Sequence, residues 1–565
     1  MSLRAVLGVL ALLIGWAGFS NRWNSDDAFI NFRIVDNLLA GHGPVYNVGE
    51  RVEAGTSTLW LGILAPGALL PGPLEWFAVL AGLAMTVAGV VWGGLAAARI
   101  HAEPGERGRW LPFGLLLFVA VPPAWHFATS GLETGLTFAW LGGSYLALTR
   151  AVLATTRVMR RDLPLAVLLG LGPLIRPDLA VFSAAFLAVW FVVHRSRGAA
   201  WVVRAGVTAV ALPVVYQVFR MGYYGSLVPN TALAKEASGS RLEQGATYLA
   251  DFAGAYLLLL PLAVVAVVAY ARWRATGRWS PKGLLILAPV AGALAHAAFV
   301  VKVGGDFMHG RLLLPALFAL ALPAAVLPFR RDDSRDTVPF AVVATWAVIA
   351  ALGLRPDYFG SDVIPPDNGG IADEHGFYVT FTGEEHPVTL EQHAGGGFMA
   401  AATAVEDHLE NGLSYVNPSP LTLYAPGGLV PRPEPGYEIV TTYPTIGVFG
   451  YSLGPQVAVV DALGLADPLA ARTALPPDRS GRIGHEKSLH PAWVVARFAG
   501  NAPADDPEVA AASAALECGA VARLERAVRS PLDWRLFVNN VVASAELTAL
   551  RLPGLPSEVA REQCP

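Results

Sequence analysis

Two adjacent carboxylates, Asp26 and Asp27, follow closely after the first long apolar run of the chain, residues 3–20. Neighbouring carboxylates at a lipid–water boundary repel each other and lose hydration, so their presence indicates a function that requires them. Glycosyl transfer is such a function, because a carboxylate can take the proton of an acceptor hydroxyl as that hydroxyl attacks the anomeric carbon. The alternative is helix capping, for which Asp27 is well placed before a helical apolar pattern over residues 29–40. We predict that at least one of the pair is catalytic, which is compatible with a capping role for the other.

The densest set of polar residues lies between two apolar runs, at positions 302–311. Lys302, His309 and Arg311 surround Asp306 there, and two glycines permit a tight turn and a close approach to a ligand. Cations at this depth would neutralise a phosphate leaving group as its charge develops. Anchoring by side chains that reach the lipid headgroups explains Lys302 and Arg311, but neither Asp306 nor His309. We predict that the three basic residues bind a donor phosphate and that Asp306 contacts the sugar or the acceptor.

Three further polar segments interrupt the apolar runs, at residues 129–134, 176–178 and 229–235. An arginine at headgroup level suits a lipid phosphate, because its guanidinium makes paired hydrogen bonds to phosphate oxygens. Each segment also has an ordinary alternative: a helix cap at Glu133, an ion pair between Arg176 and Asp178, and a plain surface lysine in the third loop. The predicted phosphate ligands are Arg176 and Lys235, and the predicted sugar or acceptor ligands are Glu133, Asn230 and Thr231.

The composition indicates that lipid is the solvent for much of the chain. Of 565 residues, 54% are hydrophobic and only 15% charged, whereas soluble proteins carry roughly a quarter charged residues. Apolar runs alternate with short charged loops up to residue 354, and no run beyond it approaches the ~20 residues of a spanning helix. We predict a transmembrane domain over 1–354 and a soluble, mixed α/β domain over 355–565. The net charge of −4 offers no excess of positive charge that would bind nucleic acid.

The apolar runs predict a polytopic bundle of about eleven transmembrane helices. Short apolar segments at 29–40 and 57–70 are expected to lie along the membrane surface instead. Basic residues gather in alternate loops, which the positive-inside rule places in the cytoplasm. The N-terminus is then inside, and the polar segments above and the C-terminal domain are outside. The predicted spans are 3–20, 74–98, 111–123, 135–149, 163–175, 178–193, 201–219, 254–271, 284–301, 312–328 and 338–354. The basic loop residues include Arg99, Arg107, Arg109, Arg157, Arg160, Arg161, Arg195, Arg197, Arg204, Arg272, Arg274, Arg278, Lys282, Arg330, Arg331 and Arg335.

The C-terminal domain contains the two cysteines of the chain, Cys518 and Cys564. Two thiols in one exported domain predict a disulfide between them. Strands are predicted at 439–442, 446–449 and 457–460, and helices at 506–529 and 533–550. A carbohydrate-binding role for this domain stays open beside ordinary core packing of its aromatic residues.

Together these residues resemble the C-type glycosyltransferase (GT-C) superfamily, whose members carry an acidic pair in the first outer loop. The chain is similar, more closely, to the actinobacterial terminal β-1,2-arabinofuranosyltransferases. The motifs that carry this resemblance are Asp26-Asp27 and the segments 37–47, 49–54, 56–58, 128–133, 304–308, 461–467 and 482–487.

The resemblance implies a GT-C-like fold in the plasma membrane, with the active site on the extracytoplasmic side. It implies decaprenyl-phosphoryl arabinofuranose as donor and the arabinan ends of arabinogalactan or lipoarabinomannan as acceptor. It places Asp26 and Asp27 at the catalytic centre and gives the exported domain a part in holding the polysaccharide.

Other functions stay open on the sequence alone. A glycosyltransferase for another lipid-linked sugar fits the same residues, and so does a non-catalytic envelope or flagellar membrane protein. A transporter fits less well, because its polar groups would lie near the membrane midplane, often with repeat symmetry. No Walker loop and no dinucleotide fingerprint is present, which argues against ATP and NAD. A divalent cation stays open at an oxygen-rich set of residues, namely Asp26, Asp27, Glu133, Asp306 and His309.

Overall fold

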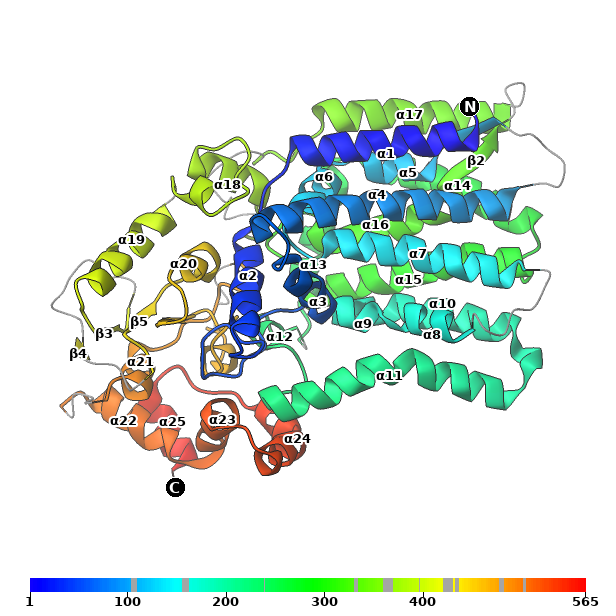
Figure 1. The fold of residues 1–565 in the computed structure, drawn as a ribbon. Helices are drawn as coiled ribbons and strands as arrows, with labels where there is room; N and C mark the ends of the chain where they lie inside the picture. Colours follow the sequence, from blue (N-terminus) through cyan, green and yellow to red (C-terminus); the bar gives the residue numbers. More distant parts are fainter. Residues whose placement is uncertain are drawn as a thin grey trace. The chain divides into compact units, whose positions relative to one another are not determined.

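The computed structural model describes most of the chain (Figure 1), and it forms two compact units. Unit 1 comprises residues 1–24, 76–214 and 240–377, and unit 2 comprises 25–75, 215–239 and 378–565. This division differs from the predicted boundary at residue 354, because residues 25–75 and 215–239 pack with the C-terminal part of the chain. The described residues are 1–102, 109–154, 162–237, 239–329, 334–358, 369–395, 397–419, 430–431, 436–476, 482–500 and 505–564.

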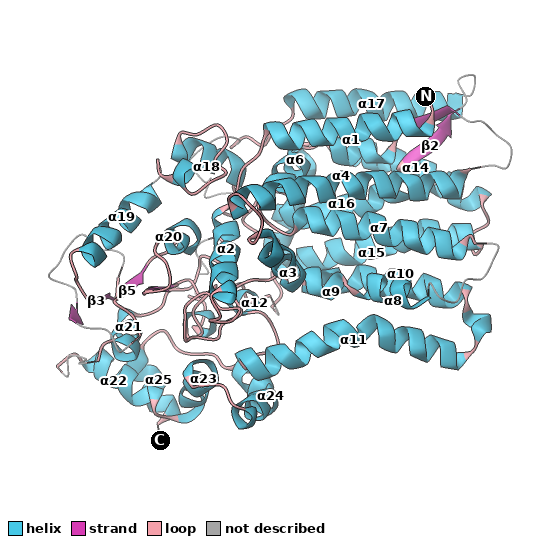
Figure 2. Cartoon of the chain, viewed as in Figure 1, coloured by secondary structure: helices cyan, strands magenta, loops and turns pink. Residues whose placement is uncertain are grey.

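Unit 1 is built almost entirely from helices, as the cyan ribbons of Figure 2 show. A short antiparallel pair of strands, β1 (Arg109–Pro112) and β2 (Val326–Phe329), is its only sheet among the described residues. Two helices, α4 and α11, continue across the boundary between the units. The helices are α1 (Leu3–Ser20), α4 (Leu74–His101), α5 (Gly114–Val119), α6 (Pro122–Thr129), α7 (Thr134–Val152), α8 (Asp162–Gly170), α9 (Gly172–Ile175), α10 (Ala180–Val193), α11 (Ala199–Tyr224), α13 (Leu242–Ala255), α14 (Leu259–Ala275), α15 (Pro281–Val303), α16 (Leu314–Ala321) and α17 (Ser334–Gly353).

Five helices of the described chain are long and apolar enough to cross a membrane, namely α1, α4, α11, α15 and α17. The pair α13 and α14 is bent by 88° and makes a sixth if it is one broken span. The predicted spans near 3–20, 74–98, 201–219, 284–301 and 338–354 correspond to the five. The predicted span 111–123 is wrong as one helix: it divides into β1, α5 and the start of α6, because the Pro122-Pro123 pair begins a new helix. The count of eleven crossings stays a prediction.

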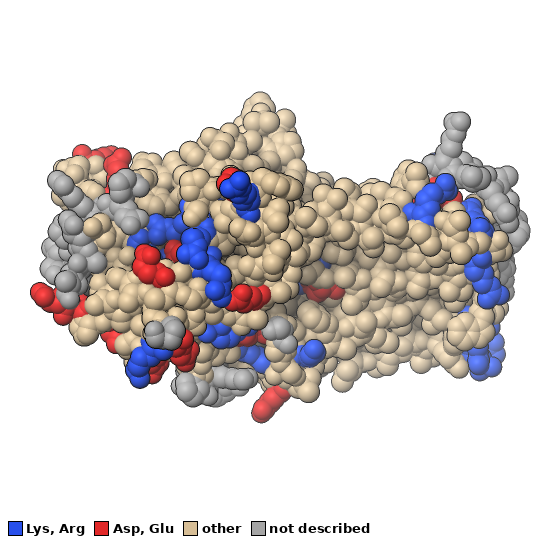
Figure 3. Space-filling view, turned by 90° about the horizontal axis from the view of Figure 1, so that it is seen from below, with Lys and Arg blue, Asp and Glu red and all other residues tan. Residues whose placement is uncertain are grey.

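Several basic loops lie at one end of unit 1, together with the N-terminus. The Trp110 N–H donates to the Met1 carbonyl (2.9 Å), and β1 pairs with β2. Arg272 after α14 lies 3.2 Å from Asp336 at the start of α17. Figure 3 shows Lys and Arg gathered beyond a broad, mainly uncharged surface. These basic loops therefore share one end of unit 1, and its orientation toward the cytoplasm stays a prediction. Arg107, Arg157, Arg160, Arg161, Arg330 and Arg331 lie outside the described residues.

Unit 2 is organised around a four-stranded sheet in the order β4-β3-β5-β6. The strands β3 (Tyr415–Asn417), β5 (Ile439–Thr442) and β6 (Val457–Val460) are parallel, and β4 (Val430–Pro431) is antiparallel to β3. Its helices are α2 (Asp26–Leu39), α3 (Thr58–Gly67), α12 (Asn230–Ala234), α19 (Gly397–Glu410), α20 (Ile446–Ser452), α21 (Pro491–Phe498), α22 (Pro507–Leu516), α23 (Gly519–Arg529), α24 (Trp534–Ala549) and α25 (Pro556–Gln563), while α18 (Glu374–Thr382) spans the boundary between the units.

The strands predicted at 439–442 and 457–460 are confirmed as β5 and β6. The strand predicted at 446–449 is wrong, because these residues form helix α20. Parallel neighbours need a crossover connection, and α20 is the helix of that crossover between β5 and β6. The helix predicted over 506–529 is two helices, α22 and α23, which are interrupted at Cys518. The helix predicted over 533–550 is confirmed as α24.

The early segment of the chain supplies part of the core of unit 2. Ile30 and Ile34, on one face of α2, are buried together with Phe449 of α20 and Val457 and Val459 of β6. This packing explains why residues 25–75 belong to unit 2 despite their distance along the chain.

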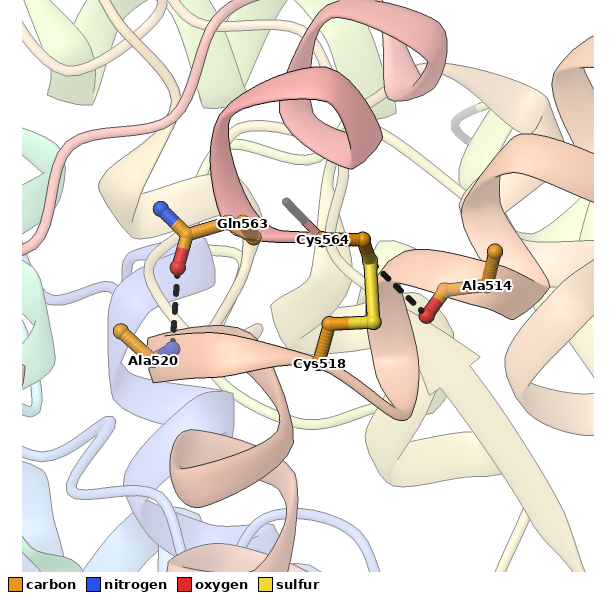
Figure 4. Close-up of a disulfide and its surroundings, with 5 residues drawn as sticks. All are labelled: Ala514, Cys518, Ala520, Gln563 and Cys564. Atoms are coloured by element: carbon orange, nitrogen blue, oxygen red, sulfur yellow. Dashed lines mark hydrogen bonds between the residues drawn. A yellow bond between two sulfur atoms is a disulfide. The ribbon is translucent and has the colours of Figure 1, made fainter.

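Cys518 and Cys564 form the predicted disulfide, with 5.3 Å between their Cα atoms (Figure 4). The bridge joins the start of α23 to the end of α25. Beside it, the side-chain oxygen of Gln563 accepts a hydrogen bond from the Ala520 N–H at 2.9 Å. The last helix is therefore fixed to unit 2 by a covalent bond and a hydrogen bond.

Candidate functional site

Unit 1 brings together Glu133, Arg176, Asp306 and Arg311, which the sequence places in three separate segments. Glu133 lies between two guanidinium groups, with its Oε1 3.5 Å from Nη2 of Arg311 and 3.8 Å from Nη1 of Arg176. Nη1 of Arg311 lies 3.7 Å from Oδ2 of Asp306. All four residues are buried. We call this group the unit 1 charge cluster.

The ion pair expected within the 176–178 turn is also present. Arg176 donates two hydrogen bonds to Asp178, at 3.0 and 2.9 Å, and His296 of α15 lies 2.7 Å from the same carboxylate. Asp178 therefore fixes Arg176 closely. Arg311 lies 3.5 Å from Glu133 and 3.7 Å from Asp306, so its guanidinium lies between two carboxylates. A guanidinium is suited to bind an anion such as a phosphate.

The backbone around Asp306 is shaped by glycines and by Tyr248 of α13. Gly305 has a φ of +81°, and a Cβ there would collide with the Tyr248 ring. The Tyr248 hydroxyl donates to the Met308 carbonyl at 2.8 Å and accepts from the Leu312 N–H at 3.1 Å. The tight turn expected from the glycine pair therefore exists, and Tyr248 holds it beside the cluster.

His309 forms hydrogen bonds with a different group of residues. Its Nδ1 lies 2.6 Å from the Asp251 carboxylate and 2.8 Å from the Tyr358 hydroxyl, and its Nε2 lies 3.1 Å from the Tyr256 hydroxyl. Both ring nitrogens are thus used inside the protein, and a contact of His309 with the donor phosphate stays a prediction. No motif of the sequence includes the partners Asp251, Tyr256 and Tyr358.

A small pocket next to His309 contains polar residues that the sequence reasoning missed. His126 of α6 stacks on His375, with 4.1 Å between ring centroids, and Asp373 lies 4.0 Å from His126. The run Asp373-Glu374-His375 is a conspicuous group of polar residues in the sequence. The predicted soluble domain, 355–565, includes this run, whereas unit 1 of the structure extends to Phe377.

Lys302 is not part of the unit 1 charge cluster. It lies in the last turn of α15, its side chain is exposed, and it makes no ion pair among the residues that the structure describes. A cation in the last turn of a helix is stabilised by the helix dipole, which accounts for this position. The expected phosphate contact of Lys302 therefore has no support in the geometry.

In unit 2, the two carboxylates of the acidic pair differ sharply. Asp26 is buried, and its two oxygens accept hydrogen bonds from the N–H groups of Gly447 and Val448, at 2.9 and 2.8 Å. Burial raises the pKa of Asp26 to about 7; the two N–H bonds oppose this shift, and the neighbouring Asp27 adds to it. Asp27 is only half-buried. Asp26 therefore caps α20, and Asp27 is the more accessible carboxylate.

The residues expected to bind sugar at 229–235 are largely occupied within unit 2. The amide nitrogen of Asn230 donates to the carbonyls of Gly464 and Asp467, at 2.8 and 3.0 Å. The Thr231 hydroxyl lies 3.0 Å from that of Thr56. Lys235 is half-buried, with its alkyl chain beside Gly484. Asn230 thus holds the 461–467 loop. That Asn230, Thr231 and Lys235 contact the donor or the acceptor stays a prediction.

The motif segment 37–47 also has a structural role. Asn37 donates to the carbonyls of Val45 and Tyr46, and Asn47 pairs with the backbone of Val459 in β6 at 2.9 and 3.1 Å. Arg33, which the sequence reasoning did not single out, donates to the Tyr46 and Val457 carbonyls at 2.8 and 2.7 Å. These residues attach the segment that carries Asp26 and Asp27 to the sheet.

No cluster of three or more His, Cys, Asp or Glu with metal-binding geometry occurs within the described ranges. The oxygen-rich set suggested by the sequence is divided, with Asp26 and Asp27 in unit 2 and Glu133, Asp306 and His309 in unit 1. The expectation that these five share one pocket stays a prediction.

Comparison with known proteins is consistent along the whole chain. Residues 437–553 match the AftB family C-terminal domain. The chain is 37% identical to a terminal β-(1→2)-arabinofuranosyltransferase of Mycobacterium tuberculosis, over 98% of this chain and 96% of that protein. It is 35% identical to the protein of the same name from Corynebacterium glutamicum, over 93% of this chain and 82% of that protein. No solved structure matches the chain.

Proposed function

Since the chain belongs to the family of terminal β-(1→2)-arabinofuranosyltransferases, we propose that it transfers arabinofuranose to the ends of cell-wall arabinan, forming β-(1→2) linkages. The observation that carries this proposal is the identity of 37% over nearly the full length of both chains. A relationship of that extent includes the membrane helices, the loops with the acidic residues and the C-terminal domain together.

The donor in this proposal is decaprenyl-phosphoryl arabinofuranose, a lipid whose sugar phosphate lies at the membrane surface. The apolar helices of the chain support a lipid-linked donor, because a protein that crosses the membrane shares the bilayer with such a lipid. We further propose that the chain crosses the plasma membrane about eleven times. Its basic end then faces the cytoplasm, and the loops with the acidic residues face the outside, in agreement with the positive-inside rule.

For the donor phosphate, Arg311 and Arg176 of the unit 1 charge cluster are the proposed ligands. Arg311 is supported because it is buried and lies 3.5 Å from Glu133 and 3.7 Å from Asp306 within the cluster. A guanidinium held in advance stabilises the charge that develops on the phosphate as the glycosidic bond breaks. Glu133 and Asp306 then act as positioning residues for the arginines.

For the reacting carboxylate, Asp27 is the better candidate of the acidic pair. Both oxygens of Asp26 already accept hydrogen bonds from α20, whereas Asp27 is more accessible. If the donor and product linkages are both β, the reaction retains configuration. A base-assisted single displacement would invert it, so Asp27 acts as a nucleophile or stabilises an ion pair in that case.

The test is a transfer assay with purified protein, decaprenyl-phosphoryl arabinofuranose and a short arabinan acceptor. The expected product is an acceptor extended by one β-(1→2)-linked arabinofuranose, and the Asp27→Asn variant should lose it. Transfer from a different lipid-linked sugar, with none from the arabinose donor, would refute the arabinose assignment and keep the glycosyltransferase class. Absence of any transfer by folded protein would refute both.

A further inference from the structure

Helix α24 (Trp534–Ala549) exposes a continuous apolar stripe on the surface of unit 2. Trp534 is 76% exposed, Val538 40% and Val542 79%, and their spacing of four residues places them on one face. Ala545 and Ala549 extend the same face and are also exposed. The opposite face is buried through Asn540, Ser544 and Leu547. An exposed stripe of this kind on an otherwise well-packed helix indicates a surface with an apolar partner.

The position of α24 is fixed by contacts with the C-terminal end of α11, within unit 2. The Asn540 amide donates to the Gly222 carbonyl at 3.0 Å. The Phe537 ring lies so close to Gly222 that a Cβ there would collide with it. Figure 1 shows α24 beside this end of α11. These two contacts therefore fix α24 beside Gly222 of α11.

Gly222 lies just after the exposed apolar residues of α11. Val214, Val215 and Val218 are each about half exposed or more, as expected for a helix whose side faces lipid. Phe219 and Tyr223 follow these valines, with their rings stacked at 4.9 Å, and Tyr216 lies beside Phe219. Aromatic residues of this kind gather at the headgroup level of membrane proteins. A membrane boundary at these aromatic residues would put Gly222, and with it α24, at the membrane surface.

We infer that α24 is a membrane-interface helix whose Trp534–Val538–Val542 face inserts into the bilayer beside α11. Arg535 and Asn539, which are exposed next to the stripe, then face the lipid headgroups. The occupant is lipid rather than a protein partner, because α24 packs on Gly222, which shares a helix face with the exposed, apolar Val215 and Val218 of α11. The helix would anchor the C-terminal part of unit 2 to the bilayer in which the donor lipid resides.

The experiment uses single cysteines, which is possible because both native cysteines are in a disulfide. Full-length Val542→Cys protein is labelled with an environment-sensitive fluorophore and reconstituted in nanodiscs with or without lipids that carry a nitroxide on the acyl chain. The matched control is Asn539→Cys, an exposed position on the same helix outside the stripe. Quenching by the nitroxide lipids should be several-fold greater at position 542 than at 539, and the emission there should be shifted to shorter wavelength.

Three outcomes would overturn the inference, provided that both variants unfold at the temperature of the native protein. One is equally weak quenching at the two positions. Another is efficient oxidative cross-linking of two Val542→Cys chains, which would assign the stripe to a second copy. The third is shielding of the probe by a soluble arabinan fragment and not by lipid, which would assign it to the polysaccharide. None of these readouts depends on transferase activity.

Discussion

Arg311 and Glu133 lie 178 positions apart in the sequence, yet Nη2 of the arginine is 3.5 Å from Oε1 of the glutamate. The same glutamate oxygen is 3.8 Å from Arg176. One buried carboxylate therefore separates two guanidinium groups that would otherwise repel each other. A buried carboxylate in this position determines where both positive charges are held, so its removal should affect anion binding more than folding.

Glu133→Gln tests this relationship, because it removes the charge and keeps the shape. We expect the Michaelis constant for the lipid-phosphate donor to rise about tenfold or more, since each arginine loses one of its counter-charges and shifts. This corresponds to ~1.4 kcal/mol of lost binding. Steady-state kinetics with varied donor measure the effect. The control is Arg204→Gln, an exposed arginine of α11, for which we expect no change.

Asp27→Asn and Asp26→Ala should separate catalysis from structure. Asparagine has nearly the size and shape of aspartate, so the Asp27→Asn variant should keep its unfolding temperature while its transfer rate falls ~100-fold or more. Asp26→Ala leaves the N–H groups of Gly447 and Val448 without their acceptor and should cost ~1–3 kcal/mol of stability. Transfer rates and thermal unfolding are measured in parallel. Full activity of the Asp27 variant would contradict its assignment.

The sequence singled out the four residues of the unit 1 charge cluster, though not their contacts with one another, because an apolar environment makes polar residues conspicuous. Glu133, Arg176, Asp306 and Arg311 are each isolated charges between hydrophobic runs, and buried charges must pair. His309 was correctly recognised as unusual, but its partners were not. Tyr256 and Tyr358 are ordinary residues in a sequence, and only the fold brings their hydroxyl groups to one imidazole.

The unit boundaries were harder to predict, because local pattern says little about which distant segments pack together. Residues 29–40 have a helical apolar face, which suits a membrane surface as well as a protein core. The structure buries Ile30 and Ile34 against Phe449, more than 400 positions later. The sequence predicts a strand at 446–449 in place of helix α20, because four apolar residues fit a strand or a short helix equally well.

The stability of the protein should depend on pH through Asp26. Its pKa is raised from 3.8 to about 7 in the folded protein, mainly by burial. The folded state therefore binds this proton more tightly than the unfolded state, so stability is greatest below about pH 4 and is lost as the pH rises through 7. The change amounts to about 4 kcal/mol at most.

Thermal unfolding at pH 5 and pH 8 measures this dependence in the native protein and in Asp26→Asn, which cannot ionise. The variant should lose less stability between the two pH values. Burial also raises the pKa of Asp461, to about 6, so the double variant with Asp461→Asn should show a smaller dependence still. An unchanged pH dependence in Asp26→Asn would disprove the assignment.

Reduction of the Cys518–Cys564 disulfide should destabilise the C-terminal helices. The bridge closes a segment of 46 positions, for which a loss of ~2–4 kcal/mol is typical. We expect Cys518→Ser/Cys564→Ser to unfold at a lower temperature than the native protein and to be insensitive to reductant. If the native protein in reductant and the double variant both unfold at the native temperature, the bridge makes no contribution to stability.

Arg497 should be the most sensitive single position of unit 2. Its buried guanidinium contacts three carboxylates: Asp467 at 2.6 Å, Glu525 at 3.1 Å, and Glu50. Arg497→Met leaves the buried carboxylates of Glu50 and Asp467 without their cation, so we expect a loss of ~3–5 kcal/mol in urea unfolding. Adding Glu50→Gln removes one uncompensated charge and should restore at least ~1 kcal/mol, although the same substitution alone should destabilise the native protein. An effect of Glu50→Gln on stability that is opposite in the variant and in the native protein would show that the two residues interact directly. Simple additivity of the two substitutions would show that Glu50 and Arg497 do not depend on each other.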